Sequence, residues 1–450
     1  MADQHDKVID RVRGAERIAS LDVIRGIAIL FILFMNIPSM GSYAFTTHDF
    51  RYPTWTTADW WTQLLTMTYL HGTQRGLLEL LFGAGIMIMA RRAMHPDGPV
   101  AVADLHYRRN LWLCVLGLFN AFVLMWFGDI LLTYGIAAVF LFPFRILKPR
   151  TQCAFAALLL TALVAYSAVL YREGIADQRN IERIEQADAA HKKLNDEDKK
   201  ILSDHRERLG RMNSLPANNA SARERIAKVD KAHKTGFAAY WNAQFEGWKL
   251  IMSWFWAIEA EIMATMLIGM ALYQWGVIQG KAKRSTYWAM VVIGYGFGLA
   301  SRGSLWIDYL KFQPGSHWQE ILMDLDRLAV TFGHLGLIHL ALATAAGKRM
   351  LKPFEAAGRM PLTIYLFTSL LMMWLVFAPW GLGLFGRWGV MQLMEVAAAI
   401  ILAELVAANV WMRHFDNGPM EWLWKSLAYQ RREPFRKSSA TLPDAVPSPI

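Results

Sequence analysis

Hydrophobic residues are gathered in long runs along this chain, and short polar clusters separate the runs. A run of about 20 apolar residues is long enough for a helix to cross the hydrocarbon core of a bilayer. The pattern therefore predicts an all-α integral membrane protein, a polytopic bundle of about ten transmembrane helices. The predicted helices lie near residues 26–43, 64–89, 110–127, 130–147, 152–171, 249–273, 286–301, 327–346, 360–379 and 389–411.

One long polar stretch, residues 172–247, interrupts this pattern. Its first part has a helix-forming composition, and Pro216 then marks a turn. We expect an extracytoplasmic helical hairpin here, with a solvated, partly mobile insertion as the alternative. The stretch divides the chain into an N-terminal membrane bundle of about five spans (1–171), the insertion, a C-terminal bundle of about five spans (248–432) and a disordered cytoplasmic tail (433–450).

The charges are distributed as membrane topology requires. The formal net charge is +10, but the basic residues are clustered before the first run, in every second loop and in the tail. The positive-inside rule then predicts that both termini lie in the cytoplasm. Because the cations follow the loops and form no continuous basic surface, we expect no nucleic-acid partner. The two cysteines both fall inside apolar runs, so no disulfide framework is predicted.

The stretch 20–40, which contains most of the first run and the residues just before it, carries three polar residues, Asp22, Arg25 and Asn36. On a helix Asp22 lies one turn before Arg25, close enough to pair with the guanidinium. Arg25 and Asn36 are separated by about three full turns, so they share one face, about 16 Å apart along the axis. Polar groups in membrane helices normally face a bundle interior or a cavity. The alternatives are an Arg25 that extends to the interface and an Asn36 that joins two helices.

Other polar residues lie within or beside the apolar runs. His71, Arg75 and Glu79 follow one another at i,i+4 spacing and share a helix face, and Asp129 lies at a predicted outer turn. Neither Glu259 with Glu261 nor His334 with His339 shares a face, so no metal site is predicted. We expect most of the lone ionisable groups to be satisfied core or interface residues: Glu259, Glu261, His334, His339, Glu395 and Glu404. No motif of a soluble enzyme is present in the sequence.

Several ordered motifs resemble a known family. They are "SLDVIRGIAILFILFMNI", "LLFGAGIMIMARR", "RRNLWLCVLGLFNAFVLMWFGDILLTYGI", "AAGRMPLTIYLFTSLL" and "NGPMEWLWKSLAY". Together they resemble YeiB-like proteins, the family of domain of unknown function 418, from about residue 17 to 432, with the polar insertion as the variable part. That family looks related to the transmembrane acyltransferases. The resemblance implies a bacterial cytoplasmic membrane and transfer of an acyl group from cytoplasmic acyl-CoA to an extracytoplasmic glycan or small acceptor.

The chain departs from the acyltransferase pattern at several positions. Arg25 fits a family arginine, but Asn36 stands where glycan-modifying relatives have an essential histidine, and YeiB-like proteins commonly have Asn there. Asn120 replaces the histidine of an "LLHA" motif, and Ile364 and Thr368 stand where Asn and Gln are usual. An amide cannot take up a proton at neutral pH, so Asn36 is not expected to be a base.

Transfer from a CoA thioester needs cations for the donor phosphates, a role suited to arginine. We predict that Arg25, oriented by Asp22, binds them together with a cytoplasmic-rim arginine such as Arg359 or Arg91. These residues form the predicted donor site.

The reaction also needs a base and an oxyanion donor. His71 is the predicted base, with His48 in reserve and Asp129 as the group that orients it. Asn36 or Arg75 is the predicted donor to the oxyanion. A structural polar cluster is the alternative interpretation of these residues.

Two other function classes remain open. Intramembrane His, Glu and Arg residues also suit a proton-coupled transporter of small solutes, although the two halves of the chain share no visible repeat. A non-catalytic scaffold or sensor would use the outer hairpin to bind partners. Membrane lipid is an expected partner in every case, and the sequence predicts no oligomeric state.

Overall fold

The computed structural model describes residues 18–42, 56–90, 99–213, 220–311 and 315–436, and these residues form helices joined by turns, with one isolated β-bridge. Five helices are long and apolar enough to cross a membrane, or six if one bent pair is a single span. The protein is therefore a multi-pass helical membrane protein. Each of the ten apolar runs falls on a helix or a broken helix, and the count of ten crossings stays a prediction.

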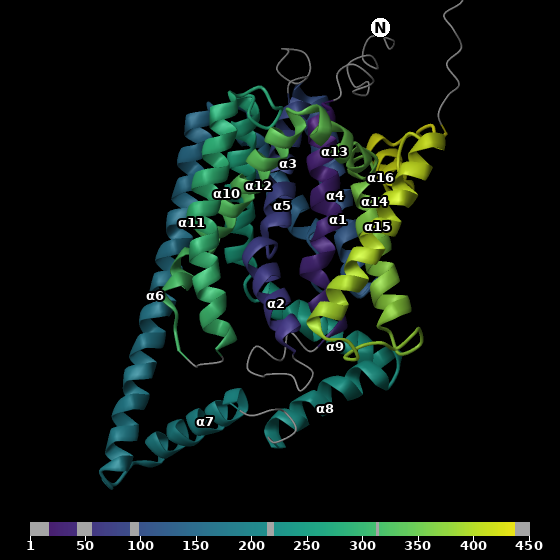
Figure 1. Ribbon diagram of the computed structural model, residues 1–450. Coiled ribbons are helices and arrows are strands. Elements are labelled where there is room, and N and C mark those ends of the chain that lie inside the picture. Colours follow the sequence, from purple (N-terminus) through teal and green to yellow (C-terminus); the bar gives the residue numbers. More distant parts are fainter. Residues whose placement is uncertain (1–17, 43–55, 91–98, 214–219, 312–314, 437–450) are drawn as a thin grey trace, which may run out of the picture.

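The helices follow one another along the chain with short connections (Figure 1). They are α1 (Ala19–Gly41), α2 (Thr57–Tyr69), α3 (Thr73–Ala90), α4 (Pro99–Phe122), α5 (Leu131–Leu141), α6 (Pro149–Ala189), α7 (Asp196–Asn213), α8 (Ala220–Lys234), α9 (Phe237–Met252), α10 (Phe255–Gln274), α11 (Arg284–Leu310), α12 (Met323–Leu342), α13 (Ala345–Gly358), α14 (Pro361–Leu370), α15 (Val390–His414) and α16 (Pro419–Tyr429).

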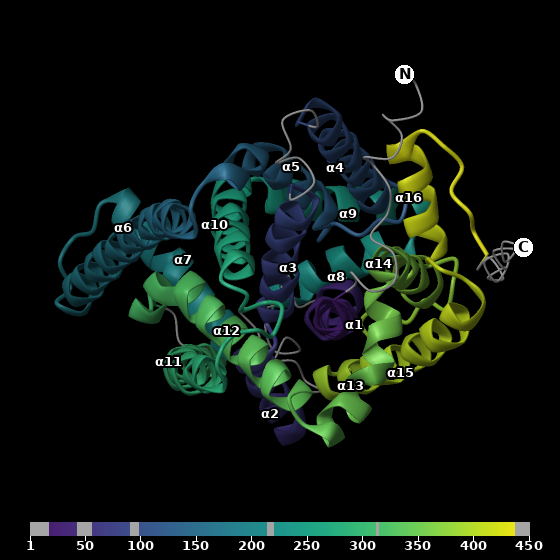
Figure 2. The ribbon, with the colours of Figure 1, turned by 90° about the horizontal axis from the view of Figure 1, so that it is seen from above.

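Helix α1 lies in the middle of the bundle, with α3 on one side and α14 and α15 on the other (Figure 2). Helix α13 turns by 115° from α12 and passes against the first half of α1. Glycine makes this crossing close. A Cβ atom at Gly26 would collide with the carbonyl oxygen of Phe354, and one at Gly358 would collide with that of Asp22. The backbones of α1 and α13 therefore touch at this point, as small residues permit in membrane helices.

The runs 64–89 and 360–379 are among the apolar runs that are broken. The run 64–89 is divided between α2 and α3, and Gly72 lies between them with a φ of +75°, a conformation that glycine adopts without strain. The run 360–379 begins as α14 and continues as a π-helical turn, Leu371–Val376. Such turns are frequent at functional sites. Both breaks lie inside membrane-length runs, where buried protein must satisfy the irregular backbone.

The polar stretch 172–247 is largely helical. Helix α6 has 41 residues and extends well beyond the bundle, and α7 and α8 lie below it (Figure 1). Helix α8 contacts a loop of the bundle through His233, whose ring stacks on Phe385 with centroids 3.7 Å apart. The Nδ1 atom of His233 lies 2.9 Å from the carbonyl oxygen of Val229 and the Nε2 atom 3.3 Å from the amide nitrogen of Gln244. The extracytoplasmic placement stays a prediction, and residues 437–450 of the predicted tail lie outside the described residues.

Candidate functional site

Four ionised side chains form a cluster inside the bundle, between α3, α10 and α12. The guanidinium of Arg75 lies 2.5 Å from Glu261 and 3.4 Å from Glu79. Arg327 lies 3.3 Å from Glu79 and also contacts Glu261. We call Arg75, Glu79, Glu261 and Arg327 the ion cluster. Two cations face two carboxylates, so the cluster is neutral and each charge has partners of the opposite sign.

A second buried pair lies near the corner between α2 and α3. Arg302 lies 3.7 Å from Asp326 and donates to the backbone oxygens of Met67, at 2.8 Å, and His71, at 2.6 Å. The ring of His71 lies against Trp306, with centroids 5.8 Å apart. Arg302 therefore holds the backbone of the α2–α3 corner, and the His71 side chain packs on α11.

The sequence pattern gave no functional role to Arg302, Asp326 or Arg327. Each lies at the edge of an apolar run, where a charged residue normally marks the end of a membrane helix. The available signal was the presence of cations and acids of matching number at the edges of neighbouring runs. That signal names no partners, because the pairs join residues far apart in the chain, such as Glu79 and Arg327.

A different arrangement surrounds the first half of α1. Arg25 lies 3.2 Å from Asp22 and donates to the carbonyl oxygen of Gly358 at 3.3 Å. Arg109 of α4 lies close enough to Arg25 for the two charges to repel, and its guanidinium stands 4.6 Å over the ring of Trp424. We call Asp22, Arg25 and Arg109 the arginine site. In the part of the chain that the structure describes, Arg109 makes no ion pair, whereas its neighbour Arg108 pairs with Asp104 at 2.7 Å.

Arg359 follows Gly358 directly in the chain, so it lies near the arginine site. Its guanidinium donates to the backbone oxygen of Asp416 at 3.2 Å. Two other predicted residues, Arg91 and His48, lie outside the described residues.

Asn36 lies three helical turns along α1 from Arg25, with 7% of its surface exposed. Its amide makes no hydrogen bond to any described residue. A buried amide normally finds partners in the protein or in bound molecules. The donor N–H groups of Asn36 are therefore buried without a partner among the described residues.

Asp129 belongs to a separate polar cluster between α4, α5 and α14. Its carboxylate accepts from the amide of Asn120 at 2.8 Å and from the backbone N–H of Leu132 at 2.9 Å. The hydroxyl of Tyr365 accepts from the backbone N–H of Ile130 at 3.2 Å. Asp129 and His71 therefore have different surroundings, and the prediction that Asp129 orients His71 gains no support from these contacts.

Two of the residues that depart from the acyltransferase pattern, Asn120 and Thr368, make polar contacts. Asn120, in the place of a histidine, binds Asp129, and the hydroxyl of Thr368 donates to Glu404 at 2.5 Å. Ile364 is buried among apolar neighbours. Among the described residues, no group of three or more His, Cys, Asp or Glu side chains is arranged to hold a metal ion.

The sequence matches known proteins along nearly its whole length. The family model described as "Protein of unknown function (DUF418)" matches residues 272–431. The uncharacterized protein YxaH of Bacillus subtilis (strain 168) is 25% identical over 435 residues, which are 94% of this chain and 97% of YxaH. The uncharacterized protein YeiB of Escherichia coli (strain K12) is 26% identical over 431 residues, 93% of this chain and 98% of YeiB. No solved structure matches significantly. The chain is thus a multi-pass membrane protein that matches the DUF418 model over residues 272–431 and is homologous along nearly its whole length to the bacterial proteins YeiB and YxaH.

Proposed function

We propose that this protein is a membrane-embedded acyltransferase, which takes an acyl group from a CoA thioester on the cytoplasmic side and passes it to a hydroxyl-bearing glycan or small acceptor on the other side. The observation that carries the proposal is Arg109, whose guanidinium has no ionic partner among the described residues and lies within electrostatic range of Arg25. Two neighbouring cations repel each other, and an anionic ligand between them removes that repulsion.

The arginine site suits the phosphate groups of CoA. Guanidinium groups bind phosphate oxygens through paired, charge-assisted hydrogen bonds. Asp22 holds Arg25 in place, with a carboxylate oxygen 3.2 Å from the guanidinium. The face of α1 that carries Arg25 also carries Asn36, so a donor bound at the arginine site would extend its acyl arm along this face toward the Asn36 amide.

The transfer step assigns a role to each polar group. The acceptor oxygen attacks the thioester carbonyl carbon, a C–O bond forms, and the carbonyl oxygen becomes an oxyanion that the Asn36 amide stabilises as a donor. The C–S bond then breaks, and the CoA thiolate leaves and takes up the proton released by the acceptor hydroxyl. Asp129 carries that proton in this proposal, because it is the titratable group of the cluster in which Asn120 replaces a histidine. His71 stays the alternative base.

The first experiment measures acetyl-CoA binding to the detergent-purified protein by calorimetry. Arg25→Ala and Arg109→Ala should each weaken binding about tenfold or more, as expected for the loss of a charge-assisted hydrogen bond. Arg108→Ala is the matched control, because Arg108 is the next residue on α4 and already pairs with Asp104. A well-folded wild type that binds no acetyl-CoA, or an equal loss in all three variants, would remove the donor role.

A small-solute transporter is the second candidate, favoured by the ion cluster and by the broken helices α2–α3 and α12–α13. Buried charges beside interrupted helices are typical of substrate and proton pathways. Uptake of solutes into liposomes without any acyl-CoA, abolished by Glu79→Gln, would favour the transporter. Release of free CoA from acetyl-CoA that depends on an acceptor would favour the acyltransferase.

A further inference from the structure

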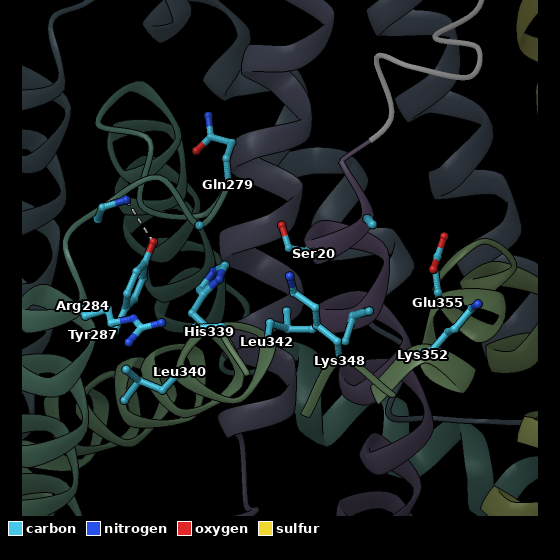
Figure 3. Close-up of a pocket in the computed structure, with 15 residues that line it drawn as sticks. Ser20, Gln279, Arg284, Tyr287, His339, Leu340, Leu342, Lys348, Lys352 and Glu355 are labelled. Carbon is cyan, nitrogen blue, oxygen red and sulfur yellow. Dashed lines mark hydrogen bonds between the residues drawn. The ribbon is translucent and has the colours of Figure 1, made fainter. Parts of the chain in front are cut away.

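A pocket of about 600 Å³ opens beside α13 and the first turns of α1 (Figure 3). It lies between the first turn of α1, the loop from α10 to α11, the start of α11 and the turn from α12 to α13. Its volume is in the range of small-molecule sites. Neither the proposed donor residues nor the ion cluster lines it.

Cations outnumber acids at the mouth of this pocket. Arg284, Lys348 and Lys352 line it together with one carboxylate, Glu355. Lys348 and Lys352 are one turn apart on α13 and share a face. Within the described ranges, none of the three cations has an ion pair or a side-chain hydrogen bond. The mouth is therefore arranged for an anionic group.

The inner wall carries polar atoms that lack partners. His339 is 95% buried, its ring hydrogen-bonds to the backbone at Ile278, and its Nε2 atom has no partner among the described residues. The side-chain oxygens of Gln279 and Ser20 are also buried without partners there. Figure 3 places all three residues around the same space. An amide oxygen accepts hydrogen bonds, and so does the His339 Nε2 atom when Nδ1 carries the ring proton, so the partner that suits both is a group that donates hydrogen bonds.

The pocket lies at the level where lipid headgroups are expected. Trp275 and Trp288, at the two ends of the α10–α11 connection, are 49% and 57% exposed, and exposed tryptophans mark the membrane–water interface. Helix α13 turns by 115° from α12, so it lies close to the membrane plane when α12 crosses the bilayer. Basic pockets between helices on the cytoplasmic side are a recurrent site for phospholipid headgroups.

We propose that this pocket binds a glycerophospholipid of the cytoplasmic leaflet, whose phosphate lies against Arg284, Lys348 and Lys352 and whose amino or hydroxyl headgroup donates to Gln279 and His339. The site is separate from the donor site of the proposed acyltransferase, and it would serve a DUF418 protein of any activity.

Native mass spectrometry of the full-length protein, released from detergent with added dihexanoyl phosphatidylethanolamine, tests the site directly. The wild type should retain one lipid, and Lys348→Ala/Lys352→Ala should lower the affinity about tenfold or more. Arg349→Ala is the matched control, since Arg349 is an exposed cation of the same helix that does not line the pocket. Equal retention by the wild type and the double variant, or an equal loss in Arg349→Ala, would overturn the site.

Two further probes decide the chemistry of the ligand. Dihexanoyl phosphatidylcholine has the same charge as phosphatidylethanolamine but no headgroup donor, so it should bind about tenfold more weakly. Equal binding of the two lipids would overturn the role of Gln279 and His339. Glycerol 3-phosphate and acetyl-CoA are soluble competitors. Displacement of the lipid by either one, in a manner that depends on Lys348 and Lys352, would overturn the lipid assignment in favour of a soluble phosphate. A melting curve verifies that each variant is folded.

Discussion

The ion cluster and the arginine site are two ways of placing arginine inside the same bundle. In the ion cluster, Arg75 and Arg327 each contact both Glu79 and Glu261. At the arginine site, Arg109 stands over Trp424 within electrostatic range of a second arginine, and it has no ion pair in the described chain. Removing a charge from water is costly, and only suitable partners offset that cost. In the ion cluster every charge therefore has a partner of the opposite sign, whereas Arg109 has none among the described residues, and the proposed function gives it an anionic donor.

The largest effect on stability is expected in the ion cluster, where each arginine is paired with carboxylates. Glu261→Ala leaves Arg75 and Arg327 with one carboxylate between them, and breaking a buried pair costs about 3–5 kcal/mol. We expect a much lower melting temperature in detergent. Glu246→Ala is the control, because Glu246 forms an exposed pair with Lys249 at 2.7 Å and should change stability by less than about 1 kcal/mol. An unchanged melting temperature for Glu261→Ala would contradict the architectural role of the cluster.

The next effect tests how the arginine site is supported. Gly358→Ala places a Cβ against the carbonyl oxygen of Asp22, so α13 has to move away from α1. We expect destabilisation of about 1–3 kcal/mol together with weaker acetyl-CoA binding, measured by melting and calorimetry. Gly85→Ala on α3 is the matched control, because nothing lies within 4 Å of the added atom. Equal melting temperatures and equal acetyl-CoA affinities of the two variants would show that the close α1–α13 contact supports neither stability nor binding.

Arg109→Met tests whether Arg109 of the arginine site, unlike the arginines of the ion cluster, is dispensable for stability. The variant loses the contact with Trp424 but also loses the repulsion from Arg25. Its stability should therefore stay within about 1 kcal/mol of the wild type, while acetyl-CoA binding falls about tenfold. A large drop in melting temperature would show that Arg109 is a structural residue like Arg75, and the contrast between the two regions would fail.

The smallest effect concerns the contact of α8 with the bundle. Burial lowers the pKa of His233 below its usual 6.5, so the folded contact favours the neutral ring. Its contribution to stability is complete above pH 6.5 and is lost as the pH falls below that value. The protection of amides in residues 226–252 against exchange, corrected for the intrinsic exchange rate at each pH, should therefore fall between pH 7 and 5. His233→Phe keeps the stacking on Phe385 and should remove the part of this change that is due to His233.

The spacing of residues along the chain predicted the contacts between residues that are close in sequence. The Asp22–Arg25 pair follows from two residues one turn apart on a helix, and the structure places them 3.2 Å from each other. The apolar runs predicted helices in the right places for the same reason. The sequence identified Arg75 as a polar residue on a helix face. Its ion pair with Glu261 could not be predicted, because Glu261 lies 186 residues further along the chain.

The sequence also could not predict which cations lack partners. Arg108 and Arg109 are neighbours on α4 with the same charge, yet one pairs with Asp104 and the other faces Trp424 of α16. The pocket beside α13 was missed for a similar reason. His339 was expected to be a satisfied core residue, and only the packing of α1, α11 and α13 around it leaves its Nε2 atom without a partner in the described chain.

Helix α6 has one more consequence. Its 41 residues form an unbroken rod, about 60 Å long at 1.5 Å per residue, while the hydrocarbon core of a bilayer is only about 30 Å thick. If one end of the rod spans the membrane, the other holds the turn into α7 roughly 30 Å from the hydrocarbon boundary. A molecule that binds at this tip is kept at a fixed height above the lipid surface, so the helix acts as a spacer between the membrane and whatever stands beyond it.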